Sequence, residues 1–127
     1  KTQKPLLFHE QAAKLLNQVN ISAYFPWHFT DPLKNPAISP QEVYKKNSDI
    51  IKKSNFVLAH LGEPSLGVGI EIELANLHKT PVIGFAPKGA RVSRMALGNP
   101  SMKSFFFYKN MKDFIMKLSE TLETINI

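Results

Sequence analysis

The residues best suited to chemistry lie in a short stretch that ends at Glu71. Residues 64–71 read Pro-Ser-Leu-Gly-Val-Gly-Ile-Glu, which places Ser65, Gly67 and Gly69 just before the carboxylate. The stretch follows an apolar segment and opens a predicted helix, so Ser65 stands where an N-cap would lie. Two glycines let a ligand approach the backbone closely, and the free N–H groups of a helix start suit an anion such as phosphate. The stretch therefore predicts an anion-binding turn.

This turn is not a complete nucleotide motif. It has the Gly-x-Gly pattern, but it lacks the third glycine of the dinucleotide fingerprint and the Gly-Lys-Ser/Thr of a P-loop. The pattern alone is weak evidence for the kind of ligand.

Glu71 occupies an unusual position on the helix that follows. The helix shows two apolar stripes on roughly opposite sides, one of Val68, Ile72 and Ala75 and one of Ile70, Leu74 and Leu77. A helix with two apolar sides is expected to be covered twice, by its own sheet and by another subunit. Glu71 lies between the stripes, where a carboxylate is costly unless it has a partner or a function. Glu73 has a similar position on the other side, so the pattern does not choose between the two.

The elements that must position this turn alternate between helices and strands. The sequence predicts helices over residues 6–19, 40–54, 67–78, 92–97 and 111–124, and strands over residues 21–25, 56–59, 81–85 and 105–108. Strands separated by helices indicate crossover connections and a parallel sheet that is covered on both faces. We therefore expect an α/β fold, a flavodoxin-like or Rossmann-like three-layer sandwich, built as a single domain over residues 1–127.

The first predicted element is a helix, which is unusual for such a sheet. A flavodoxin-like sheet, ordered 2-1-3-4-5, needs a first strand in its interior. Residues 1–4 are too polar for that position, and the sequence begins with Lys1 and not with Met. We therefore expect an upstream strand that this sequence does not include.

Composition excludes several classes of protein. At 127 residues, 43% hydrophobic and 20% charged, the chain is neither disordered nor fibrous. The absence of cysteine excludes disulfides, zinc thiolates, iron–sulfur clusters and a cysteine nucleophile. No apolar run approaches the roughly 20 residues of a membrane helix, and no signal peptide is visible. We expect a cytoplasmic protein that does not bind membranes.

The chain is basic, with a formal net charge of +6, which would attract phosphate-bearing partners. Lys45, Lys46, Lys52 and Lys53 share one predicted helix, but no aromatic residues are interleaved with them for stacking on bases. This pattern favours a solvated helix face over a site for a nucleic acid polymer.

Residues 64–71, together with Ser-Asn-Phe-Val-Leu-Ala over residues 54–59, resemble the nucleoside 2-deoxyribosyltransferase family. The resemblance is closest to its branch of 2'-deoxynucleoside 5'-phosphate N-hydrolases. It extends from about Pro5 to Leu118 and is strongest over residues 48–84. Residues 5–8 look like the family's segment just after its first strand, which agrees with the expected upstream strand.

The resemblance implies roles for particular residues. Glu71 matches the family's nucleophilic glutamate, and Ser65 matches a serine that binds phosphate in the hydrolase branch, where the transferases have aspartate. Ser93 resembles, across a short gap, the serine that reaches a neighbouring subunit's phosphate. Because family members commonly assemble as dimers, the resemblance also implies a homodimer or higher homo-oligomer.

The chain departs from the family in two places. The family's glycine-containing loop after the first strand is not in this sequence. The position of the aspartate that handles the nucleobase is Asn47, a candidate catalytic residue that can hydrogen-bond a base but cannot deliver a proton. His28 is a candidate substitute acid, or a loop histidine bonded to backbone, and His60 ends a strand where it could line the site. The histidines have no metal-ligand spacing, so we expect no metal and no cofactor.

The mechanism that the resemblance implies is covalent glycosyl transfer. Glu71 would attack the anomeric carbon, the base would leave, and water or a second base would accept the sugar. The leading hypothesis is an N-glycosidase of (deoxy)nucleoside 5'-monophosphates, with a nucleotide or nucleoside as its partner. The alternatives are a nucleoside 2-deoxyribosyltransferase, a specialist for modified nucleotides, or a nucleotide-binding protein with weak or lost catalysis.

Overall fold

The structure is a computed structural model that describes residues 3–19, 22–25 and 38–125. Its elements are α1 (Gln3–Val19), β1 (Ala23–Tyr24), α3 (Pro40–Lys53), β2 (Phe56–His60), α4 (Leu66–Leu77), β3 (Val82–Pro87), α5 (Arg94–Leu97), β4 (Met102–Tyr108) and α6 (Met111–Thr124). Their type and order are those predicted from the sequence. The largest differences are at the starts of α1 and β4, which both begin three residues earlier than predicted.

The described strands form one parallel sheet in the order β1-β2-β3-β4. This confirms the α/β class and the parallel sheet. One edge differs from the expected 2-1-3-4-5 order, because β1 pairs directly with β2 through Ala23 opposite Phe56 and Tyr24 opposite Val57. β1 therefore pairs with the first two residues of β2 on this side, Phe56 and Val57. An upstream strand stays a prediction.

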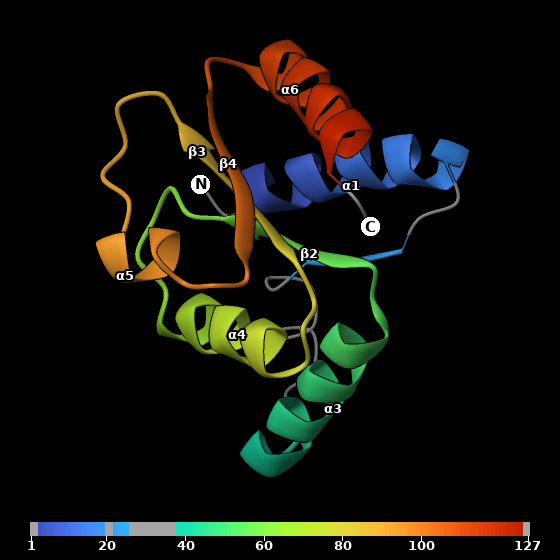
Figure 1. Ribbon diagram of the computed structural model, residues 1–127, viewed down its shortest axis with the longest axis vertical. Coiled ribbons are helices and arrows are strands. Elements are labelled where there is room, and N and C mark those ends of the chain that lie inside the picture. Colours follow the sequence, from blue (N-terminus) through green and yellow to red (C-terminus); the bar gives the residue numbers. More distant parts are fainter. Residues whose placement is uncertain (1–2, 20–21, 26–37, 126–127) are drawn as a thin grey trace.

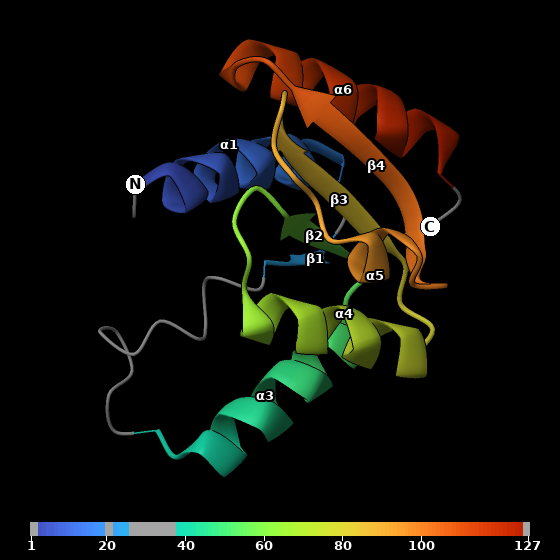
Figure 2. The same ribbon diagram turned by 90° about the vertical axis from the view of Figure 1, so that its left-hand side faces the viewer.

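Two layers of helices cover the sheet, as Figures 1 and 2 show: α1 and α6 lie on one side, and α3 and α4 on the other. Successive residues of a strand point to opposite faces. Accordingly, Phe56 and Leu58 of β2 join the core beneath α1 and α6, while Val57 and Ala59 join the core beneath α3 and α4. This double burial explains why β2 is apolar without alternation.

Local signals fix the start of α3. Ser39 is its N-cap: the Ser39 hydroxyl accepts from the Glu42 N–H at 3.2 Å, and the Glu42 carboxylate accepts in return from the Ser39 N–H at 3.4 Å. Pro40 takes the first helical position, where its missing N–H costs nothing. The four lysines of this helix are exposed, which agrees with a solvated face. In the part of the chain that the structure describes, no helix combines the length and apolarity needed to cross a bilayer.

Candidate active site

Three elements converge on the side chain of Glu71. This carboxylate lies on α4 and is only 4% exposed. Its Oε2 atom accepts two hydrogen bonds, one from the Tyr24 hydroxyl of β1 and one from the Asn47 amide of α3 at 2.9 Å. Its Oε1 atom accepts no hydrogen bond from the described residues. One oxygen is therefore fixed and the other is left for a further partner.

Burial dominates the electrostatics of this cluster. It raises the pKa of Glu71 to about 7, although the hydrogen bonds from Tyr24 and Asn47 act in the opposite direction. The pKa of Tyr24 is also raised, by burial first and then by the neighbouring Glu71 charge. The phenol therefore keeps its proton at neutral pH and serves as a donor to the carboxylate.

The structure distinguishes Glu71 from Glu73, which the helical pattern could not do. Glu73 is exposed, and its two oxygens accept from Asn99 at 2.8 Å and from Asn76 at 3.4 Å. These are contacts of a surface carboxylate, and they leave Glu71 as the buried one.

The two predicted apolar stripes of α4 need one correction. Leu74 is buried in the same core as Ile72 and Ala75, while Ile70 and Leu77 are exposed. Leu74 directly precedes Ala75 and packs beside it beneath the helix, so the buried face is wider than a single stripe. The exposed stripe therefore contains Ile70 and Leu77 but not Leu74.

The turn at the start of α4 has the predicted N-cap. The Val68 N–H donates to the Ser65 hydroxyl at 3.3 Å, and Ser65 is exposed. A Cβ atom added to Gly67 or Gly69 would meet no other atom within 4 Å, apart from the neighbouring backbone of the helix. Gly67 lies one turn before Glu71 on the same face of the helix. The backbone at Gly67 is therefore open on the side of Glu71, and the backbone at Gly69 is open on a different side of the helix.

Two further predicted residues, His60 and Ser93, contact other parts of the molecule. His60 packs on the opposite face of the sheet, with its Nε2 atom 3.0 Å from the Tyr108 hydroxyl and its ring edge-on to Phe85. Ser93 is exposed and caps α5 by accepting from the Ala96 N–H at 3.2 Å. His28 lies outside the described residues. The roles of these three residues stay predictions.

Tyr24 is the contact that the sequence analysis missed. It falls inside the predicted strand over residues 21–25, where an aromatic residue is expected simply to fill the core. The available signal is chemical: a buried tyrosine hydroxyl needs a hydrogen-bond partner. Its partner is 47 positions further along the chain, so only the fold identifies it.

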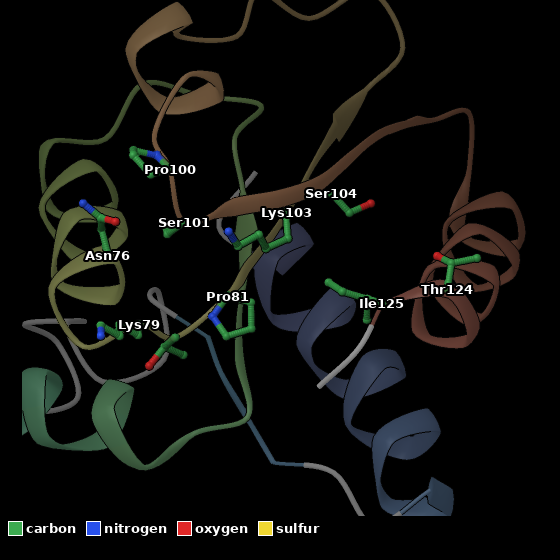
Figure 3. Close-up of a pocket in the computed structure, with 10 residues that line it drawn as sticks. Asn76, Lys79, Pro81, Pro100, Ser101, Lys103, Ser104, Thr124 and Ile125 are labelled. Carbon is green, nitrogen blue, oxygen red and sulfur yellow. The ribbon is translucent and has the colours of Figure 1, made fainter.

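A separate pocket of about 710 Å³ opens where β3 and β4 begin, and Figure 3 shows the residues around it. It is lined by Asn76, Lys79, Thr80, Pro81, Pro100, Ser101, Lys103, Ser104, Thr124 and Ile125. None of the predicted site residues lines it, and its ionisable groups are two lysines without a carboxylate or an imidazole. The pocket therefore presents positive charge, but no pair of side chains suited to general acid and base catalysis. Within the described ranges, no three His, Asp or Glu side chains gather as metal ligands would.

Comparisons with known proteins point to one group of enzymes. No family model matches the chain. A protein of Methanosarcina mazei, provisionally named 2'-deoxynucleoside 5'-phosphate N-hydrolase 1, is 36% identical over 77 residues, which cover 58% of this chain and 48% of the relative. Proteins of the same name from Methanosarcina barkeri and Syntrophotalea carbinolica are 35% and 29% identical, with 48% and 57% of their lengths matched. The chain thus spans about half the length of the curated relatives it matches.

A solved structure supports the same grouping at the level of the fold. The CMP N-glycosidase BcmB of Clostridium botulinum matches this chain with a TM-score of 0.59 and 24% identity, over 68% of this chain and 74% of the other. Together the relatives and this fold confirm the resemblance to nucleoside 2-deoxyribosyltransferase-like proteins that the sequence indicated.

Proposed function

We propose that this chain, which resembles the nucleoside 2-deoxyribosyltransferase-like proteins in sequence and in fold, is an N-glycosidase of nucleoside 5'-monophosphates. The observation that carries the proposal is the buried Glu71 carboxylate, with Oε2 held by two donors and Oε1 without a hydrogen bond from the described residues. The relatives' name, 2'-deoxynucleoside 5'-phosphate N-hydrolase, supports deoxyribonucleotides as the first candidates. The CMP N-glycosidase with the same fold supports ribonucleotides as the second class of candidate substrate.

In this proposal Glu71 is the nucleophile. Its Oε1 atom attacks C1' of the sugar, the bond between C1' and the base nitrogen breaks, and the bonding electrons leave with the base. Water then attacks the glycosyl ester, releasing the sugar phosphate and restoring the carboxylate. Because the pKa of Glu71 is about 7, the attacking anion is well populated at and above neutral pH.

The turn before Glu71 would bind the 5'-phosphate. Ser65 and the N–H groups of the first turn of α4 supply donors at the positive end of the helix dipole. Glu71 lies six positions after Ser65, which corresponds to about 9 Å along the helix axis. The open space beside Gly67, one turn before Glu71, leaves room for a sugar phosphate on this side of the helix.

A second copy of the chain would complete the site. Leu66, Ile70 and Leu77 recur on one side of α4 and are 85%, 46% and 66% exposed, and Met95 of α5 is 87% exposed. The Asn99–Glu73 hydrogen bond ties the segment after α5 to this side of α4. Exposed apolar side chains gathered on one side of a helix typify an interface. A homodimer would bring Ser93 towards the partner's phosphate, and sedimentation of the wild type as a monomer would contradict it.

The direct test is release of free base from a panel of deoxyribo- and ribonucleoside monophosphates, followed by chromatography. We expect Glu71→Gln to lower the rate by about a thousandfold or more, as removal of a nucleophile does in other enzymes. Glu73→Gln is the matched control, because it changes an exposed carboxylate on the same helix and should release base at the wild-type rate. Equal rates for wild type and Glu71→Gln would overturn the proposal.

Asn47 favours a second candidate, a nucleotide-binding protein that does not turn its ligand over. An amide has no proton to give to a departing base. Thermal stabilisation by a nucleotide with no base released after long incubation would support this candidate. A transferase would instead form a new nucleoside only when a second free base is supplied, and Ser65 in place of aspartate argues against it.

A further inference from the structure

We propose that Asn47 positions the carboxylate of Glu71 and does not act on the departing base, so that the enzyme prefers nucleotides whose base leaves readily as an anion. This inference rests on the proposed N-glycosidase function. It assigns to Asn47 a role different from that of the aspartate that the family resemblance places at this position.

One N–H of the Asn47 amide is committed to Glu71. Asn47 is 3% exposed, and its Nδ2 atom donates to Glu71 Oε2 at 2.9 Å. A carboxylate only accepts, so the NH₂ group of the amide is the end that must face it. A buried amide in this position cannot turn to a substrate without leaving the carboxylate short of one donor, which is costly at low solvent exposure.

The surrounding structure fixes this geometry. The next residue of α3, Ser48, has its hydroxyl 2.9 Å from Nε2 of His78, at the C-terminal end of α4. Thr80, just after that end, donates its hydroxyl to the carbonyl of Ile51 at 2.9 Å. The middle and the last turn of α3 are thus joined to the C-terminal end of α4 and the residues after it, in addition to the Asn47–Glu71 contact, and Figure 2 shows the two helices side by side. Asn47 therefore acts as part of a rigid support for the nucleophile.

A carboxyl group at position 47 would behave differently. Two carboxyl groups at this separation share a proton, because both cannot ionise easily at once, and the shared proton is available to a leaving base. The Asn47 amide donates to Glu71 at every pH and supplies no such proton. When the bond between C1' and the base breaks, the electron pair stays on the ring nitrogen, and the base departs as an anion that water protonates later. Bases with more acidic N–H groups should therefore leave faster.

The test uses one series of substrates with graded leaving groups: 2'-deoxyuridine 5'-monophosphate and its 5-methyl, 5-fluoro and 5-bromo forms. For the wild type we expect kcat to rise by at least about tenfold from the 5-methyl to the 5-halogen members. Asn47→Asp should flatten this dependence and add a descending limb to the pH profile. Asp49→Asn, an exposed exchange two positions along the same helix, should keep the wild-type slope. Equal kcat values for the wild type across the four substrates would overturn the proposed preference for bases that leave readily as anions.

A second measurement does not depend on activity: an NMR titration of the Glu71 carboxyl carbon in the full chain. Among the described titratable groups, Tyr24 contacts Glu71, whereas His78 faces Ser48 and the charged groups of α3 are exposed. We expect Asn47→Leu to raise the apparent pKa of Glu71, and Asn47→Asp to give two coupled steps. Melting curves confirm that each variant is folded.

The two measurements separate the failures of the two proposals. If no substrate releases base but the Asn47→Leu titration shifts as expected, then the proposed function is wrong and the positioning contact is right. If the titrations of the wild type and Asn47→Leu coincide, then Asn47 does not position Glu71, whatever the activity.

Discussion

The two faces of the sheet are built on different principles. Beneath α1 and α6 the buried side chains are apolar or aromatic, with Phe85, Phe114 and Leu118 at the centre. Beneath α3 and α4 the apolar side chains are mostly small or β-branched, apart from Tyr24 and Leu74, and the carboxylate of Glu71 and the amide of Asn47 are buried in the same layer. One face is a conventional hydrophobic core, while the other contains a polar cluster that costs stability to bury.

This difference indicates where stability and chemistry are located. A buried carboxylate is destabilising unless donors compensate it, and here the raised pKa of Glu71 shows that its two donors compensate only partly. Among the described residues, the core beneath α1 and α6 contains no buried carboxylate. Substitutions on the two faces should therefore change stability in opposite directions.

The largest effect is expected from Phe114→Ala on the apolar face. Phe114 is fully buried and packs against Phe85, with ring centroids 4.7 Å apart, and against Tyr108 at 5.9 Å. Its truncation should lower the free energy of unfolding by about 3–5 kcal/mol, as measured by urea denaturation. Phe107→Ala is the control, because Phe107 is 41% exposed and should cost clearly less. Similar losses for both variants would show that this face is not the main core.

An effect of opposite sign is expected from Glu71→Gln on the other face. The pKa of Glu71 is raised from 4.5 to about 7, so the folded state holds this proton more tightly than the unfolded state. The stability of the wild type should therefore fall as pH rises from about 4.5 to about 7, by roughly 3.5 kcal/mol at about 1.4 kcal/mol per pH unit. Glu71→Gln should lack this slope and be the more stable protein above pH 7.

The measurement is the free energy of unfolding of both proteins across this pH range. Glu73→Gln serves as the control, because its carboxylate is exposed and its removal should leave the slope in place. Parallel profiles for the wild type and Glu71→Gln would mean that Glu71 is not titrating from a buried position.

The smallest effect concerns Gly69 in α4. An alanine there meets no clash and needs no change in backbone, so Gly69→Ala should raise the free energy of unfolding by about 0.5–1 kcal/mol. If the turn binds a sugar phosphate, the added methyl should at the same time raise KM for the nucleotide. Gly89→Ala is the control, because Gly89 has a φ of 87° and alanine is strained there. If Gly69→Ala is more stable than the wild type but has the same KM, then the substrate does not bind against the backbone at Gly69.

Much of the fold could be read from local sequence. The capping box of Ser39 and Glu42, the N-cap Ser65 and the apolar run of β2 all depend on neighbours within a few residues. Their physical causes are backbone hydrogen bonding and the periodicity of burial, and both are visible in a linear sequence.

The details of the site depended on distant contacts. The helical pattern could not rank Glu71 above Glu73, placed Leu74 on the wrong side of α4, and gave no sign that His60 packs with Tyr108 on the opposite face. The direct pairing of β1 with β2 was equally hidden. Each of these outcomes depends on which surfaces meet, and local propensity does not contain that information.

The sequence by itself determined the order of helices and strands, the helix caps and the presence of a carboxylate after a glycine-containing turn, because these features follow from interactions between near neighbours. Only the tertiary structure decided that this carboxylate is buried and held by Tyr24 and Asn47, which lie 47 and 24 positions away in the chain. The reason is that desolvation and hydrogen bonding act through space, and here three separate elements must pack together before either can act on Glu71.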